Sequence, residues 1–227
     1  MTTTALVTGA NKGIGFEIVK QLLARGVDVY LGARDVERGE KAAIDTGARF
    51  VQLDVTDPES VRRAAASIER LDVLVNNAGV VGGRGQSPGG ADLDAVRTAF
   101  GTNVFGVITV TDAFLPLLRE SAHPRVVNVS STVGSLTGMF AHESPIGVAY
   151  PPSKAALNAV TLQYAKALKD TAVKVNAVCP GYCDTDLNNH SGYRTPAQGA
   201  RIAVEMATLG DDGPTGSFYD DEGVVAW

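Results

Sequence analysis

The sequence predicts an α/β fold in which a doubly wound parallel sheet carries helices on both faces, in three α/β/α layers. Two observations predict it: short uncharged apolar segments alternate with helical patterns, and glycine-rich or polar stretches follow these segments. Ligands of such sheets bind beyond the carboxyl ends of the strands, so the polar stretches mark the expected binding edge. The 227 residues suit a single domain over 1–227.

Composition narrows the class of protein. A net charge of −5 offers no basic surface for nucleic acid, and a hydrophobic content of 44% is ordinary for a globular chain. No apolar run reaches the ~18 residues of a spanning helix, and no basic start followed by an apolar core marks a secretory signal. We therefore expect no nucleic-acid partner, no membrane partner and a cytoplasmic location.

The chain begins with a strand, a glycine turn and a helix. Residues 5–7 are a short apolar strand, Gly9, Gly13 and Gly15 follow, and residues 14–25 repeat apolar side chains every four positions. Glycines let backbone approach a ligand closely, and a helix N-terminus presents free N–H groups with partial positive charge. This order predicts a phosphate site, although its spacing differs from the common G-x-G-x-x-G pattern and a glycine loop without a ligand is the alternative.

The later elements follow in alternation. Short apolar segments predict strands at residues 27–31, 50–53, 73–75, 126–129 and 173–178, and the pattern also allows a last strand at 216–219. Helical patterns predict helices at residues 36–44, 58–70, 93–119, 151–168 and 196–208. Asp57 supplies an N-cap before a proline at the first helical position, and Gly101 is expected to break the long helix. Five glycines and a proline make residues 80–91 a loop.

The end of the second strand distinguishes the two nicotinamide cofactors. An acidic residue there binds the ribose 2′-hydroxyl of NAD, whereas an arginine accommodates the 2′-phosphate of NADP. Arg34 stands at this end and Lys12 lies in the glycine turn, so two cations favour NADP(H) over NAD(H). Asp35 leaves two interpretations open, because it could bind a ribose or cap the next helix.

Tyr150 and Lys154 are four residues apart at the start of a helix, which can place both on one face. Pro151 and Pro152 are tolerated only in the first helical turn, so Tyr150 must lie at or just before the helix start. A residue before proline is biased away from helical backbone, however. A nearby ammonium and a helix N-terminus should lower the phenol pKa from ~10, which predicts a general acid for a carbonyl oxygen.

Two further polar residues suit the same site. Ser131, just beyond the fifth strand, could hydrogen-bond the same carbonyl oxygen, and Asn103 inside an apolar helix needs a buried partner or a water. Taken singly, Tyr150 and Lys154 could equally be a surface pair, Ser131 a turn residue and Asn103 a helix kink. The order of all four after the glycine turn favours one site. The only cysteines, Cys179 and Cys183, are weak evidence for zinc or a disulfide, and no metal site is predicted.

An ordered set of motifs carries a resemblance to a known family: Thr8-Gly9-x-x-x-Gly13-x-Gly15, Asn76-Asn77-Ala78-Gly79, Asn103, Ser131, Tyr150-x-x-x-Lys154 and Pro180-Gly181. Over nearly its whole length the chain resembles the short-chain dehydrogenases/reductases, whose fold is the Rossmann fold. Within that family it is similar to the NADPH-dependent carbonyl reductases, through Asn11-Lys12, Ala33-Arg34-Asp35-Val36, residues 126–131, Cys179-Pro180-Gly181-Tyr182 and Gly213-Pro214-x-Gly216.

The resemblance implies a mechanism. NADPH would deliver hydride to an aldehyde, ketone or quinone carbonyl, and Tyr150 would donate the proton. Lys154 would lower the tyrosine pKa and hold the nicotinamide ribose. Ser131 would orient the substrate oxygen, and Asn103 would hold a water that links the lysine to solvent. The implied cofactor-binding residues are Gly9, Asn11, Lys12, Gly13, Ile14, Gly15, Arg34, Asp54, Val55, Asn77, Ala78, Gly79, Tyr150, Lys154, Pro180, Gly181, Cys183 and Thr185.

Some questions stay open at this level. Ser131 and Tyr150 are 19 positions apart, more than in common family members and far less than in monomeric carbonyl reductases, so residues 132–149, with Phe140, His142 and Pro145, are expected to shape the pocket. A homodimer, a homotetramer and a monomer are all compatible with the sequence. A catalytically silent NADP(H)-binding sensor or scaffold of the same fold is the alternative function, since it would keep the same cofactor loop.

Overall fold

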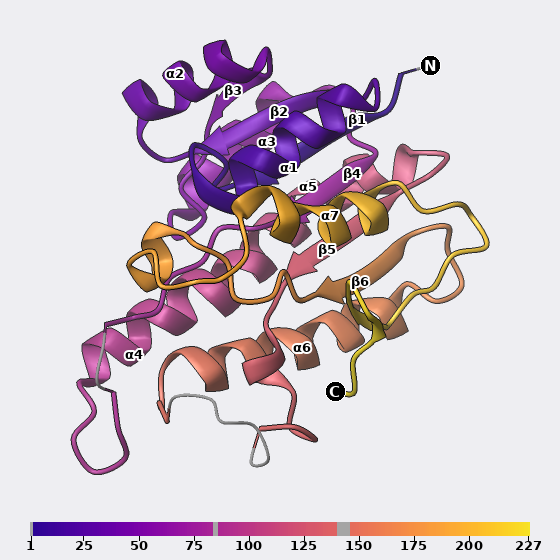
Figure 1. Cartoon of the computed structure of the whole chain (residues 1–227). Helices are drawn as coiled ribbons and strands as arrows, with labels where there is room; N and C mark the ends of the chain where they lie inside the picture. The colour runs from indigo at the N-terminus through magenta and orange to yellow at the C-terminus, as the bar shows by residue number, and fades with distance from the viewer. Residues whose placement is uncertain (1, 84–85, 140–145) are drawn as a thin grey trace.

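The computed structural model describes residues 2–83, 86–139 and 146–227. One sheet runs through it in the strand order β3-β2-β1-β4-β5-β6-β7-β8 (Figure 1). The strands are β1 (Thr4–Thr8), β2 (Asp28–Ala33), β3 (Arg49–Gln52), β4 (Val73–Asn76), β5 (Arg125–Val129), β6 (Lys174–Val178), β7 (Phe218–Asp220) and β8 (Gly223–Val224). Neighbouring strands are parallel except for the pair β7–β8. The predicted doubly wound α/β sheet is confirmed, whereas the short antiparallel β8 was not predicted.

Helices connect the strands as predicted, with ends that differ by a few residues. They are α1 (Gly13–Ala24), α2 (Val36–Thr46), α3 (Pro58–Ser67), α4 (Leu93–Phe100), α5 (Val107–Glu120), α6 (Tyr150–Ala167) and α7 (Pro196–Ala207). The sequence-based end of the third helix was about three residues too late, because Ile68 turns to extended backbone and is buried. Asp57 caps this helix as predicted, accepting a hydrogen bond from the Glu59 N–H at 2.9 Å.

The core consists of two layers of buried apolar side chains, one between each face of the sheet and the helices that cover that face. On one face, α1 and α7 pack with the side chains of alternate strand residues such as Val7, Val75 and Val127. On the other face, α3, α5 and α6 cover Leu6, Leu74 and their neighbours. Because both faces of the sheet are covered, the open edge for a ligand is the row of strand carboxyl ends (Figure 1).

The long helix after β4 is not broken at Gly101, contrary to expectation. Residues Gly101–Gly106 continue it as a π-helix between α4 and α5. A π-helix widens the turn and is frequent at functional sites. Gly106 is required there, because a Cβ atom on it would lie 2.9 Å from the Val55 side chain.

The continuous helix Leu93–Glu120 has the length and composition of a membrane span, with a mean hydropathy of 1.4 in its most apolar window. Half of that window is buried inside the fold. Val110, Phe114 and Leu118 belong to the core layer beneath the sheet. A core helix meets the same criteria of length and composition, so this finding adds no membrane partner to the account.

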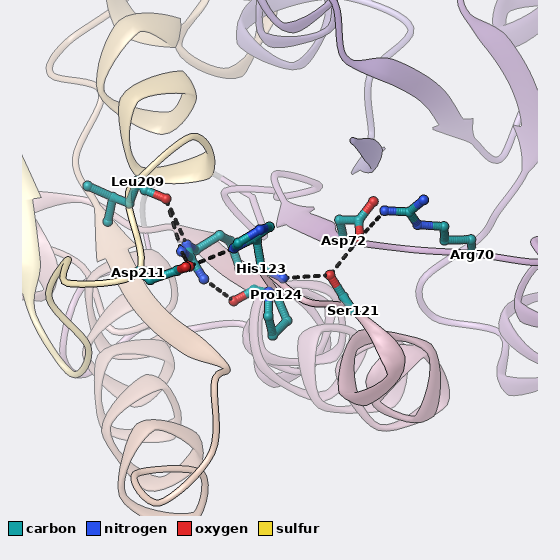
Figure 2. Close-up of polar contacts among 8 residues, drawn as sticks. Arg70, Asp72, Ser121, His123, Pro124, Leu209 and Asp211 are labelled. Atoms are coloured by element: carbon teal, nitrogen blue, oxygen red, sulfur yellow. Dashed lines mark hydrogen bonds and ion pairs between the residues drawn. The ribbon is translucent and has the colours of Figure 1, made fainter. Parts of the chain in front are cut away.

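Buried charged side chains stabilise the other end of the sheet, where the parallel strands begin (Figure 2). Asp72, which is 3% exposed, accepts hydrogen bonds from the Thr4 N–H at 2.8 Å, Ser121 Oγ at 2.5 Å and Arg70 Nη2 at 3.1 Å. Burial opposes ionisation, but these three donors outweigh it and hold the pKa of Asp72 below its usual range. This carboxylate therefore joins the starts of β1 and β4 to the end of α5.

A second buried charge fastens the start of β5. The Arg125 side chain is 3% exposed, and its Nε and Nη2 atoms donate to the Leu209 carbonyl oxygen at 3.1 and 3.0 Å. Its Nη2 also binds Asp211 Oδ1 at 2.9 Å, which His123 Nδ1 contacts at 2.8 Å (Figure 2). These bonds hold the segment after α7 against β5 and leave the opposite edge free for function.

Candidate active site

A cleft of about 1010 Å³ lies at the carboxyl ends of the parallel strands. The predicted site residues that line it are Gly9, Asn11, Lys12, Gly13, Ile14, Gly15, Arg34, Asp54, Val55, Asn77, Ala78, Gly79, Tyr150, Lys154, Pro180 and Thr185. Asn103, Ser131, Gly181 and Cys183 lie outside this lining. Other lining residues were not predicted, among them Leu53, Thr56, Val80, Asp186, Leu187 and His190.

The glycine turn is packed so tightly that side chains are excluded. Gly9 and Gly13 have φ values of 62° and 60°, which favour glycine. A Cβ atom on Gly9 would lie 2.8 Å from the Ala78 Cα atom, and one on Gly15 would lie 2.4 Å from Asn77 Nδ2. Asn77 fixes the turn in return, because its Nδ2 donates to the carbonyl oxygens of Thr8 at 2.9 Å and Gly9 at 3.1 Å.

Helix α1 points its N-terminus into this cleft. Its N-cap residue, Lys12, has extended backbone and makes no side-chain capping bond. The first N–H groups of the helix therefore receive no cap from this residue, and Gly13 to Gly15 line the cavity. Free N–H groups and the helix dipole together make a site for a phosphate group.

The two predicted cations have different environments. The exposed Arg34 lines the cleft at the end of β2, and among the described residues its guanidinium has no hydrogen-bond or ion-pair partner. Asp35 proves to be the helix cap: its Oδ1 accepts from the Arg38 N–H at 2.9 Å, and the residue does not line the cleft. This geometry favours the capping interpretation of Asp35 and leaves Arg34 as the charged group at the strand end.

Lys12, in contrast, is paired across the cleft. Its Nζ lies 2.5 Å from Asp186 Oδ2, on the segment that follows β6. His190 contacts Asp186 Oδ1 at 2.8 Å and Asp184 Oδ1 at 2.6 Å, and these two carboxylates raise the pKa of His190. All four groups are well exposed, so each pair contributes little alone. Sequence reasoning missed this contact because its partners are 174 positions apart.

Tyr150, Lys154 and Ser131 meet at one end of the cleft. Tyr150 is the first residue of α6 despite the proline that follows it, so the predicted shared face is confirmed. Lys154 Nζ lies 5.6 Å from the centroid of the Tyr150 ring and donates to the Val129 carbonyl oxygen at 2.8 Å. The Ser131 hydroxyl lies close enough to Tyr150 to lower the pKa of that phenol. A phenol, an ammonium and a hydroxyl therefore lie together beside the cleft.

The expected lowering of the tyrosine pKa is wrong for this structure. Burial raises the pKa of Tyr150, the charge of a Cys179 thiolate would raise it further, and only the nearby Ser131 hydroxyl lowers it. Burial also lowers the pKa of Lys154 to about 8, and a Cys179 thiolate would raise it. The sequence shows the ammonium and the helix N-terminus but not burial, which is the largest influence on the pKa of this phenol. The phenol is accordingly protonated near neutral pH, the state that a proton donor requires.

Asn103 acts on the framework of the site rather than in the cleft. It is fully buried in the π-helix, and its Nδ2 donates to the Val80 carbonyl oxygen and to Ser153 Oγ, both at 2.9 Å. Its Oδ1 accepts from the Val80 N–H at 2.9 Å. The side-chain amide is thus occupied by protein groups and joins the loop after β4 to α6, and the role of Asn103 in holding a water stays a prediction.

Other residues missed by sequence reasoning hold the Ser131 turn on α6. Ser130 Oγ donates to Asn158 Oδ1 at 2.6 Å, and Asn158 Nδ2 donates to the Gly134 carbonyl oxygen at 3.1 Å. A Cβ atom on Gly134 would lie 2.6 Å from the Lys154 carbonyl carbon, so the turn rests directly on the helix. The signal that could have identified Asn158 is its position four residues after Lys154, on the same helical face.

The two cysteines are free and buried. Cys179 Sγ accepts from the N–H groups of Thr132 at 3.3 Å and Gly181 at 3.4 Å. Cys183 Sγ donates to the Pro180 carbonyl oxygen at 3.3 Å. In the described ranges no group of three or more His, Cys, Asp or Glu side chains could hold a metal ion. Phe140, His142 and Pro145, expected to shape the pocket, lie outside the described residues.

The fold and the site together define an oxidoreductase class: a parallel sheet with a phosphate-binding turn and a tyrosine–lysine pair at the edge of one cleft. The chain belongs to the short-chain dehydrogenase family, since the family model described as short chain dehydrogenase matches residues 3–194. The predicted family membership is thereby confirmed, and the Rossmann fold with it.

Known relatives span nearly the whole chain. Salutaridine reductase of Papaver bracteatum is 36% identical, with 95% of this chain and 93% of the relative covered. (-)-Isopiperitenone reductase of Mentha piperita is 33% identical, covering 98% and 97%. Among solved structures, NADPH-bound carbonyl reductase from chicken fatty liver has a TM-score of 0.88 and 29% identity, covering 100% of this chain and 99% of that one.

Proposed function

We propose that this protein is an NADP(H)-dependent reductase that converts aldehyde, ketone or quinone carbonyls to alcohols, with Tyr150 as the general acid. The observation that carries the proposal is the pair of Tyr150 and Lys154, which line the same cleft as the glycine turn, with the Lys154 Nζ 5.6 Å from the centroid of the phenol ring and the Ser131 hydroxyl close enough to lower the phenol pKa. The resemblance to NADPH-bound carbonyl reductase supports it.

The residues of the cleft fit the proposed cofactor. A Cβ atom on Gly9 or Gly15 would meet protein atoms within 2.8 Å, so the turn is a cradle that only backbone can form. The α1 N-terminus suits the pyrophosphate, and Arg34, without a protein partner among the described residues, suits the 2′-phosphate of NADP. Asp35 would disfavour that phosphate, but its carboxylate is occupied as a helix cap.

When bound, NADPH supplies the hydride that reduces the carbonyl carbon. The chain supplies the proton and the orientation. The Tyr150 hydroxyl donates its proton to the carbonyl oxygen, and the Ser131 hydroxyl hydrogen-bonds that oxygen as negative charge develops on it. Lys154, with a pKa of about 8, is largely cationic at neutral pH and stabilises the phenolate that remains.

The test is Tyr150→Phe, which removes one hydroxyl. Turnover of NADPH with a panel of aldehydes, ketones and quinones should fall by on the order of a thousandfold, because general acid catalysis contributes roughly 10²- to 10⁴-fold. NADPH should still bind, as measured by its fluorescence. Tyr164→Phe is the matched control, because Tyr164 lies on the same helix but its hydroxyl binds Asp112 at 2.6 Å, away from the cleft.

The same experiment distinguishes the alternative of a cofactor-binding sensor or scaffold. A sensor would bind NADPH tightly and consume none of it with any member of the panel. Full turnover by Tyr150→Phe would instead remove the proposed mechanism. The position of Ser131 and Lys154 around one phenol favours the enzyme, because a sensor needs no proton donor.

A further inference from the structure

The last three residues of the chain pack beneath the turn that carries Ser131. We call residues 225–227 the tail. The Trp227 ring stacks on Phe218 of β7, with ring centroids 5.5 Å apart and planes inclined by 25°. Val225 and Trp227 pack against a small buried cluster of Ala177, Cys179 and Phe218. This cluster is separate from the two main core layers and lies at the end of β6.

Hydrogen bonds join the tail to the residues that follow Ser131. The Ser135 hydroxyl donates to the Ala226 carbonyl oxygen at 2.7 Å. The Trp227 carbonyl oxygen accepts from the Thr137 N–H at 3.0 Å and from Thr137 Oγ1 at 2.6 Å. Ser135 is 3% exposed, and its hydroxyl also accepts from the Gly138 N–H at 3.2 Å. This one hydroxyl therefore bonds both to the tail and to the residues that follow Ser131.

The turn transmits this attachment to Ser131. Residues Thr132–Gly134 form a 3₁₀ turn whose Gly134 N–H donates to the Ser131 carbonyl oxygen at 2.9 Å. The Ser135 N–H donates to the Thr132 carbonyl oxygen at 3.0 Å. The Thr132 N–H donates to Cys179 Sγ, which belongs to the same small cluster as Trp227. The turn is therefore held between α6 on one side and the tail on the other.

We propose that the tail is a positioning element for the reaction: the stack of Trp227 on Phe218 and the carbonyl oxygens of Ala226 and Trp227 hold the Ser131 hydroxyl against Tyr150. Ala226 and Trp227 are thus positioning residues that act through Ser135 and Thr137. This inference depends on the proposed function, because it assigns a purpose to the placement of the Ser131 hydroxyl beside Tyr150. Without the tail, the turn would keep its contact with α6 and lose its opposite support.

The proposal has a consequence that does not require turnover. The nearby Ser131 hydroxyl lowers the pKa of Tyr150, so loosening the turn that carries Ser131 should raise that pKa. We expect this pKa to shift upward, because the charged form of the phenol loses a polar group that stabilises it. The difference between the ultraviolet pH titrations of the protein and its Tyr150→Phe variant isolates this phenol from the other five tyrosines.

The experiment uses Trp227→Ala, which removes the stacking ring, in the full chain. The expected results are a raised Tyr150 pKa, a kcat lowered by about tenfold and an unchanged Kd for NADPH. Trp227→Phe should restore most of both, since it keeps an aromatic stack. Val224→Ala is the matched control. Val224 lies in the neighbouring β8 and is 72% exposed, and no hydrogen bond between described residues joins it to the turn.

An unchanged kcat together with an unchanged Tyr150 pKa in folded Trp227→Ala would overturn the proposal. If Trp227→Ala gives no cooperative thermal transition, Ser135→Ala decides the question by the same two measurements, because it removes the bond to Ala226, together with the bond from the Gly138 N–H, and leaves the aromatic stack in place. A raised Tyr150 pKa in a protein that reduces no carbonyl would support the positioning role while refuting the proposed function. The two claims can therefore fail separately.

Discussion

Gly15→Ala tests the packing of the cofactor turn most sharply. The added Cβ atom would lie 2.4 Å from Asn77 Nδ2, 2.8 Å from the Gly9 carbonyl oxygen and 2.9 Å from the Ala10 Cα atom. Two of these three neighbours are backbone atoms of the turn itself. The most direct relief is movement of the Asn77 side chain, which breaks its bonds to the Thr8 and Gly9 carbonyl oxygens.

These contacts set the size of the effect. Two lost hydrogen bonds cost about 1 kcal/mol each, and residual overpacking costs roughly 1–3 kcal/mol. We expect Gly15→Ala to lower the free energy of unfolding by about 3–5 kcal/mol, as measured by urea denaturation. The same displacement opens the turn at the α1 N-terminus, so the Kd for NADPH should rise by at least about tenfold.

Gly90→Ala is the matched control for this change. A Cβ atom on Gly90 would meet nothing within 4 Å, and its φ lies outside the left-handed region. This variant should unfold within about 0.5 kcal/mol of the parent and bind NADPH equally well. If Gly15→Ala behaved like Gly90→Ala in both assays, the close packing of the turn against Asn77 would not govern cofactor binding.

Two more predictions concern single charges. Arg34→Ala should raise the Kd for NADPH by on the order of tenfold to a hundredfold and leave the Kd for NADH nearly unchanged, because the guanidinium is expected to bind only the 2′-phosphate. Arg38→Ala is the control, because Arg38 lies outside the cleft, and it should change neither Kd. An equal loss of affinity for both cofactors in Arg34→Ala would contradict the assignment of Arg34 to the 2′-phosphate. The folded-state pKa of Asp72 lies below its ordinary value of 3.8, so its carboxylate stabilises the fold above that pH, and the contribution disappears as pH falls through the lowered value. Asp72→Asn should therefore cost about 1–3 kcal/mol at pH 7 in urea unfolding and progressively less in acid, whereas the exposed Asp170→Asn should cost little; a pH-independent difference would refute this.

Local patterns predicted much of the fold. Apolar segments such as residues 73–75 and 126–129 located the central strands because parallel strands are buried on both faces. Two elements escaped this reasoning for physical reasons. β8 has two residues, which is too short for any periodicity. The π-helix at Gly101 preserves the helical pattern, and glycine suggested a break where tertiary packing keeps the helix continuous.

The candidate site divides in the same way. Motif residues such as Gly13 and Tyr150 lie in the cleft as predicted, because their neighbours in sequence fix their positions. Contacts between distant segments were not predictable: Lys12 meets Asp186, and the Asn103 amide is used by Val80 and Ser153. The direction of the Tyr150 pKa shift also depended on burial, which no local pattern measures.

The central claim is that hydride and proton reach a carbonyl group in this cleft. Reduction of a reactive aldehyde or quinone by NADPH that carries deuterium at its transferable position tests it most directly. We predict deuterium on the carbinol carbon of the alcohol formed from an aldehyde and one cofactor oxidised for each alcohol formed. Tyr150→Phe should lose this transfer. Tight NADPH binding without transfer of label to any carbonyl compound would contradict it.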